Sequence, residues 1–247
     1  MGAIDCSYQQ CDGCGALQTD EPSWIAEAYG PKFHGLGISS AYRSVWCQAL
    51  VGYLVRVLGA RGKILDFGGG VGLLCRLLRD LGFDAWYYDR YTSPAFAADF
   101  KVEQLEPEYS TITAFEVFEH FPNPRENAAE IFDLKPDFVI VGTDRYANQG
   151  PDWHYIFPQT GQHLFFWSPD AHAWLAGHFG YHVVTCGKKI TVYSRRKVNL
   201  FRKTSANACE LGAKVTQLML PLLGAPGLKR DEAWKVAELN RQFPCDH

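Results

Sequence analysis

The feature that most constrains the fold is a strand, a glycine-rich turn, a helix and a second strand within residues 63–89. The first strand is Lys63-Ile64-Leu65-Asp66-Phe67, and the turn follows it with glycines at positions 68, 69, 70 and 72. Leucines at helical spacing then predict a helix that stops at Gly82, before a strand over Asp84–Asp89. Glycines let a backbone approach a ligand closely, and the helix behind them presents unpaired N–H groups. This order predicts a ligand site at the end of a parallel strand.

The spacing of the glycines separates the candidate ligands. They fall as Gly68-x-Gly70-x-Gly72, whereas a dinucleotide site needs its third glycine one position later, where this chain has leucine. No Gly-Lys-Ser/Thr follows, which excludes a P-loop. Asp66 lies two residues before the first glycine, where a carboxylate attracts a cationic amino acid group and repels a pyrophosphate. Asp89 ends the second strand, where an acid can accept hydrogen bonds from ribose hydroxyls.

Strands and helices continue to alternate along the chain, which predicts an α/β fold with a mostly parallel sheet and helices on both faces. Helices are expected over 124–131 and from Ser168-Pro169 onward, and a closing hairpin is expected around Gly187. Further strands are expected over 112–115 and 138–141, and the faint third strand is placed at Phe100-Lys101-Val102.

Helical segments flank this α/β region. One helix is expected to begin at Glu21-Pro22-Ser23 and to end at Gly30-Pro31, and a longer one is expected from Tyr42 to Val57. We therefore divide the chain into a cysteine-bearing start (1–20), an N-terminal helical cap (21–60), an α/β domain (61–195) and a C-terminal helical extension (196–247).

Charge and composition limit the classes of partner. The 247 residues carry a formal net charge of −3 without a long run of like charges, which counts against a nucleic-acid partner. No apolar run is long enough to span a bilayer, and the first residues lack a secretory signal. We therefore expect a cytoplasmic protein without a membrane partner, and we leave the oligomeric state open.

Three motifs together resemble the class I methyltransferases that use S-adenosylmethionine (SAM). They are Ile64–Gly70, Ala114–Phe121 and Gly161–Ser168. The stretch Trp24–Tyr29, with the N-terminal cysteines, is most similar to bacterial members of the ubiquinone-biosynthesis-like group. The resemblance covers residues 10–195.

The resemblance implies a Rossmann-like class I fold whose seven-stranded sheet has an antiparallel last strand. It also implies SAM as the cofactor, with the methionine part cradled by the glycine turn and the ribose held by Asp89. The segment that starts at Phe115-Glu116 is expected beside the sulfonium. The expected cofactor-binding residues are Asp66, Gly68, Gly69, Gly70, Gly72, Asp89, Arg90, Phe115 and Glu116.

Acids and a histidine directly follow the strand expected at 112–115. Glu116, Glu119 and His120 are spaced so that a helical turn would place them on one face, and His163 comes later. The set resembles that of magnesium-dependent small-RNA 2′-O-methyltransferases, which implies a divalent metal held by these four residues. Many small-molecule methyltransferases share the motif without a known metal, so we also expect His120, His163 and Glu116 as catalytic acid–base groups.

An aromatic segment, Trp153-His154-Tyr155, precedes His163 and is expected to line the acceptor pocket together with it. The alternative is that these rings only pack in the interior.

The N-terminal cysteines resemble half of a zinc ribbon. Cys11-Asp12-Gly13-Cys14 supplies one pair, and Cys6 offers a third thiolate. A structural zinc site needs four ligands, and the sequence contains no second Cys-x-x-Cys. We therefore favour an incomplete knuckle over a bound zinc.

The leading hypothesis is a SAM-dependent methyltransferase for a small-molecule or carbohydrate-like acceptor, with O-methylation favoured. One alternative is a metal-dependent RNA 2′-O-methyltransferase. The other is a non-catalytic module that retains the fold for protein contacts, and the intact acids and glycines of the turn count against it.

Overall fold

The computed structural model describes residues 6–28, 40–198, 206–223 and 226–242. The predicted helix end at Gly30-Pro31 lies outside these residues. Among the described residues, no helix is both long and apolar enough to cross a membrane.

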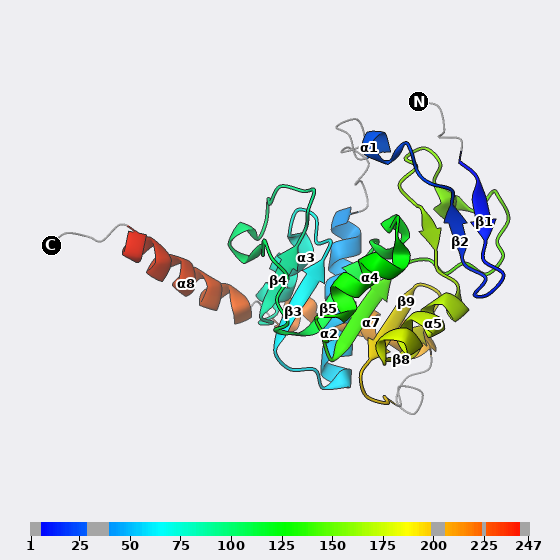
Figure 1. The fold of residues 1–247 in the computed structure, drawn as a ribbon. Helices are drawn as coiled ribbons and strands as arrows, with labels where there is room; N and C mark the ends of the chain where they lie inside the picture. The colour runs from blue at the N-terminus through cyan, green and yellow to red at the C-terminus, as the bar shows by residue number, and fades with distance from the viewer. Residues whose placement is uncertain (1–5, 29–39, 199–205, 224–225, 243–247) are drawn as a thin grey trace.

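A six-stranded sheet forms the centre of the molecule (Figure 1). Its first four strands in spatial order run parallel to one another, and β9 is antiparallel to both of its neighbours. The predicted α/β class and the antiparallel last strand are therefore confirmed. The spatial order is β4 (Ala85–Tyr88), β3 (Lys63–Phe67), β5 (Tyr109–Phe115), β6 (Phe138–Gly142), β9 (Ile190–Ser194) and β8 (His182–Cys186).

The strand expected at 100–102 is reduced to a single β-bridge beside β4. Lys101 pairs with Tyr87 in parallel, and the Val102 N–H donates to the Tyr87 carbonyl at 2.8 Å. The residues Ala98–Phe100 are wound into a 3-10 turn, so little of this segment is extended along β4. The expected seven strands are thus six strands and one bridge.

Helices cover both faces of the sheet because its strands carry apolar side chains on both sides. Leu65 and Val139 point to the face covered by α4 and α5, whereas Ile64 and Ile140 point to the face covered by α2 and α3. The predicted helix start at Ser168-Pro169 is confirmed, and the Ser168 Oγ caps α5 by accepting the Ala171 N–H at 2.9 Å. The four helices are α2 (Ser40–Leu58), α3 (Leu73–Asp80), α4 (Pro124–Phe132) and α5 (Pro169–Phe179).

A small antiparallel sheet, which the sequence does not predict, lies beside the central one (Figure 1). It consists of β1 (Tyr8–Gln10), β2 (Leu17–Thr19) and β7 (Phe165–Phe166), and the short helix α1 (Ile25–Ala28) follows β2. Strands of two or three residues are too short to give an alternating pattern. The pairing of β2 with β7 joins the N-terminal segment to the chain around residue 165.

Two helices form the C-terminal extension. Helix α7 (Ala206–Leu223) packs along α2, and α8 (Pro226–Gln242) begins against α3 and then points away from the body of the molecule (Figure 1). Asp231 holds α8 to α3, since its carboxylate accepts hydrogen bonds from Arg79 Nε at 2.8 Å and from Arg76 at 2.7 Å. Burial alone would raise the pKa of Asp231, but the hydrogen bonds from Arg79 and Arg76 lower it to about 2.

We predict that Asp231→Ala releases α8 from α3. Asp231 and Arg79 are both buried, and removing one partner of a buried pair typically costs about 3–5 kcal/mol. Hydrogen–deuterium exchange at pH 7 should be faster in residues 226–235 of the variant. Because the folded-state pKa is depressed, the wild-type contact should be complete above pH of about 4 and be lost as the pH falls towards 2.

The control is Glu238→Gln, which removes a carboxylate that pairs with Lys235 on the same helix. Its exchange should match that of the wild type. Unchanged exchange in Asp231→Ala would show that α8 docks by its apolar contacts alone.

Candidate functional site

The glycine turn, residues 68–72, has one face packed and one face open. A Cβ at Gly68 would lie 2.5 Å from Val117 Cγ2, and one at Gly72 would lie 2.9 Å from the ring of Tyr87. Gly70 has a φ of +57°, and apart from Gly70 and its two chain neighbours no described residue has an atom within 4 Å of the position that a Cβ would take there. The turn therefore presents the bare backbone at Gly70 to open space, where a ligand can approach it closely.

Asp66 lies beneath the turn and is only 4% exposed. Its Oδ1 accepts a hydrogen bond from Thr113 Oγ1 at 2.8 Å, across the pairing of β3 with β5. Burial raises the pKa of Asp66 to about 7, although the bond from Thr113 lowers it. Asp66 therefore supports the turn, and its side chain offers little exposed surface to a ligand.

Asp89 braces the turn from the end of β4. Its Oδ2 accepts the Gly70 N–H at 2.9 Å, and its Oδ1 accepts the N–H groups of Tyr91 and Thr92 at 2.9 and 2.7 Å. A carboxylate has about four acceptor positions, so Oδ2 can accept a further bond from a ligand hydroxyl. The Arg90 guanidinium instead bonds to the Tyr88 hydroxyl at 2.8 Å and pairs with Glu130 on α4.

Phe115 and Glu116 lie at the end of β5, next to the glycine turn. The Phe115 ring packs over Gly142, where a Cβ would lie 2.4 Å from it. Glu116 has a φ of +54°, a conformation that is rare for a residue other than glycine, and its N–H donates to the Gly142 carbonyl at 2.8 Å. Burial, followed by the charge of Glu119, raises the pKa of Glu116 to about 8. Its carboxyl group can therefore gain or lose a proton near neutral pH.

Glu119, His120 and His163 converge, and we call them the Glu119 cluster. One potential ligand atom from each lies within 4.8 Å of the others. Glu119 is completely buried; its Oε1 accepts a 2.5 Å hydrogen bond from the Tyr155 hydroxyl, while Oε2 has no partner among the described residues. Burying an unpaired carboxylate oxygen is unfavourable, so this oxygen indicates a missing partner.

The two imidazoles are oriented by backbone carbonyls. His120 Nδ1 lies 2.9 Å from the Gln162 carbonyl oxygen, and His163 Nδ1 lies 2.6 Å from that of Tyr155. Since a carbonyl only accepts, each Nδ1 carries the proton, and Nε2 is the ring atom that would bind a metal. Burial lowers the pKa of His120, which favours the neutral ring that metal binding requires.

The predicted metal set needs a correction, because Glu116 is not part of the Glu119 cluster. The helical face expected for 116–120 does not form: the 3-10 turn spans only Phe118–His120, and Glu116 precedes it with a positive φ. The alternative of a zinc site at Cys6, Cys11 and Cys14, over which the sequence favoured an incomplete knuckle, has no support in the geometry, because these three thiols do not form a ligand group among the described residues. The Glu119 cluster is the only group of three potential ligands found among the described residues, and the Cys6 thiol instead bonds to the Tyr8 hydroxyl at 3.3 Å.

The three side chains of the segment Trp153-His154-Tyr155, which was expected to line an acceptor pocket, lie in three different surroundings. Tyr155 is buried and holds the cluster, binding Glu119 through its hydroxyl and His163 through its carbonyl. The Trp153 ring packs between Tyr155 and Phe166, with centroids 5.3 and 5.4 Å away. The His154 side chain is 77% exposed and lies on the surface near Asp144.

Sequence reasoning missed two residues that position the site. Thr113 supports Asp66, and it shares a face with Asp66 because both lie on paired strands of the same sheet. Gln162 holds His120 through its carbonyl, and its side chain donates to the Ala28 carbonyl at 2.7 Å. The alternation along β5 could have identified Thr113 as a buried polar residue, whereas no local pattern points to Gln162.

Comparisons with known proteins address the family and the fold. A sequence model of a family described as a methyltransferase domain matches residues 40–186. No functionally curated protein matches the chain. Among solved structures, TnmH superimposes with a TM-score of 0.50 at 14% identity, over 70% of this chain and 61% of TnmH. The magnesium protoporphyrin IX methyltransferase from Synechocystis PCC 6803, solved with bound SAH, gives 0.49 at 15% identity, over 70% of this chain and 93% of that chain.

At sequence identities of 14% and 15%, the similarity to these two structures shows a shared fold and nothing about the reaction. The family model carries the assignment, since it spans more than half of the chain and includes the glycine turn, Asp89 and the segment after β5. This protein therefore belongs to the methyltransferase-domain family, and it is a SAM-dependent methyltransferase of class I.

Proposed function

We propose that this enzyme transfers the methyl group of SAM to a hydroxyl oxygen of a small-molecule or carbohydrate-like acceptor, with a divalent metal held by the Glu119 cluster. The observation that carries the proposal is the buried Glu119 Oε2, which has no hydrogen-bond partner in the described part of the chain and lies beside two imidazoles. A carboxylate and two imidazoles are a donor set that suits Zn²⁺ or Mn²⁺ better than Mg²⁺, which prefers oxygen ligands. A bound divalent cation would lower the pKa of an acceptor hydroxyl.

The chain's own residues supply binding and alignment. We infer that the Gly70 backbone and Asp89 hold SAM, with Asp66 supporting the turn from below. Methyl transfer needs the acceptor oxygen, the methyl carbon and the sulfur in line, so alignment contributes much of the acceleration. Val117 contacts the turn and Glu119 follows two residues later, which supports an acceptor position between the cofactor and the cluster.

Proton transfer is the second role that we propose for this region. Glu116 titrates near neutral pH, which makes it a candidate base for the acceptor proton. His120 and His163 take this role instead if no metal is bound. The assignment to the ubiquinone-biosynthesis-like bacterial group, the cytoplasmic location and the contacts of Arg90, Phe115, Trp153 and His154 with ligands stay predictions.

An RNA 2′-hydroxyl is the second candidate acceptor, because the same cluster would activate it. The net charge of −3 favours the small molecule, since a protein that binds RNA gains most of its affinity from cationic contacts with phosphates.

We predict that Asp89→Ala weakens the binding of S-adenosylhomocysteine by about 5- to 150-fold, equivalent to about 1–3 kcal/mol. The variant loses both the proposed ribose acceptor and the bond that braces Gly70. Isothermal titration calorimetry provides the measurement. Asp99→Ala, which removes an exposed acid paired with Lys235, should bind like the wild type. Equal affinities of Asp89→Ala and the wild type would rule out the ribose contact.

We also predict that the wild type binds one Mn²⁺ and that Glu119→Gln or His163→Ala weakens this binding at least about 10-fold. Calorimetry of the metal-free protein with Mn²⁺, repeated with Mg²⁺ and Zn²⁺, needs no knowledge of the acceptor. Tyr155→Phe should have a smaller effect, because it removes only the hydroxyl that orients Glu119. Glu126→Gln, in the first turn of α4, is the matched control. If the wild type binds none of the three cations, the metal proposal is wrong and acid–base catalysis by the same residues takes its place.

A further inference from the structure

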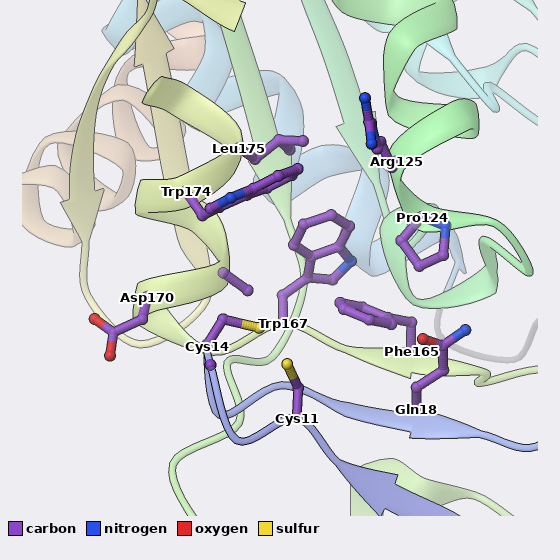
Figure 2. Close-up of a pocket in the computed structure, with 12 residues that line it drawn as sticks. Cys11, Cys14, Gln18, Pro124, Arg125, Phe165, Trp167, Asp170, Trp174 and Leu175 are labelled. Carbon is purple, nitrogen blue, oxygen red and sulfur yellow. The ribbon is translucent and has the colours of Figure 1, made fainter. Parts of the chain in front are cut away.

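A second site lies on the opposite face of the small sheet from the Glu119 cluster. Side chains alternate along β7, so Phe166 faces Tyr155 and His163, whereas Phe165 and Trp167 face the other way. These two rings line a cavity of about 470 Å³ together with Trp174 of α5 (Figure 2). The cavity and the Glu119 cluster are therefore separate sites.

The Cys11–Cys14 turn forms one wall of this cavity (Figure 2). The backbone of the turn is closed by two bonds of 2.8 Å, from the Cys11 N–H to the Ala16 carbonyl and from the Gly15 N–H to the Cys11 carbonyl. Both thiols line the same cavity (Figure 2). A disulfide between them would close a short loop whose ends the turn already holds together.

The two thiols differ in reactivity. Cys11 is exposed, and backbone N–H groups of Cys14 and Gly13 donate to its sulfur, which lowers its pKa despite the nearby charge of Asp12. Cys14 is partly buried, and burial raises its pKa. The thiolate is the attacking species in thiol–disulfide exchange, so Cys11 suits the attacking role and Cys14 the resolving role.

The other described cysteines differ from this pair. Cys6 bonds to the Tyr8 hydroxyl and is not grouped with the pair. Cys47, Cys75 and Cys186 are buried, and burial raises the pKa of Cys47 and of Cys75. Exchange chemistry is therefore expected to be selective for the Cys11–Cys14 turn.

We propose that Cys11 and Cys14 form a thiol–disulfide exchange site for low-molecular-mass disulfides that enter the cavity of Figure 2. The Cys11 thiolate attacks one sulfur of the small disulfide, forming a mixed disulfide and releasing one thiolate. The Cys14 thiol then loses its proton and attacks the Cys11 sulfur, which releases the second small thiol. The cysteine pair is oxidised by two electrons, and the small disulfide is reduced to two thiols.

Glutathione disulfide is the probe for the test. The full chain, reduced and freed of metal, is equilibrated in buffers of increasing glutathione disulfide to glutathione ratio, alkylated under denaturing conditions and mapped by peptide mass. We expect Cys11 and Cys14 to lose alkylation together, with an intramolecular disulfide between them, while Cys47, Cys75 and Cys186 stay alkylated. The transition should have one midpoint.

Two variants assign the roles of the thiols. Cys14→Ser should trap Cys11 as a mixed disulfide with glutathione, whereas Cys11→Ser should react at least about 10-fold more slowly, because the remaining thiol is less accessible and less ionised. Cys6→Ser is the matched control and should behave like the wild type. The proposal is overturned if the pair stays reduced at every ratio or if Cys6 is the partner that Cys11 selects. It is equally overturned if the purified protein holds a stoichiometric zinc that keeps the pair from exchange.

Discussion

The parallel pairing of β3 with β5 decides where the chemistry of this protein lies. The pairing sets Asp66 opposite Thr113, and their side chains share a buried hydrogen bond of 2.8 Å. Because parallel strands end at the same edge of a sheet, the glycine turn after β3 and the Glu116 segment after β5 emerge side by side. The contact of Val117 with Gly68 is the direct result. Both the proposed cofactor site and the Glu119 cluster depend on this one register.

The Glu119 cluster is completed by residues 155–164, which lie close to Glu119 and His120 in space although they are about 40 positions later in the sequence. Tyr155 and Gln162 bring backbone carbonyls to the two histidines, and the Leu164 N–H donates to the Glu119 carbonyl at 2.7 Å. The pairing of β7 with β2 then holds this segment in place. Imidazoles oriented through Nδ1 would lose little freedom on binding a ligand at Nε2, so the proposed metal site is oriented before any ion binds.

The small sheet also separates the Glu119 cluster from the cavity beside the cysteine turn. Phe166 faces the Glu119 cluster, and Phe165 faces the cavity that the cysteine turn borders. A strand of two residues is long enough to place one ring on each side of the small sheet, because successive side chains of a strand point to opposite faces. Ser168, which caps α5, also donates to the Cys14 carbonyl, so the cysteine turn is tied to the α/β core.

Features that depend on local spacing could be predicted from the sequence alone. The glycine turn, the alternation of strands and helices, the start of α5 and the proximity of Glu119 to His120 all follow from residues a few positions apart. Other features depend on contacts between distant parts of the chain. Tertiary structure reduced the third strand to a bridge at Lys101, excluded Glu116 from the cluster and gave Tyr155 a supporting role. These outcomes rest on contacts such as Tyr155 with Glu119, 36 residues apart, and His120 with Gln162, 42 residues apart. Periodicity specifies which face of an element is buried, whereas only the packing of the complete chain specifies what that face meets.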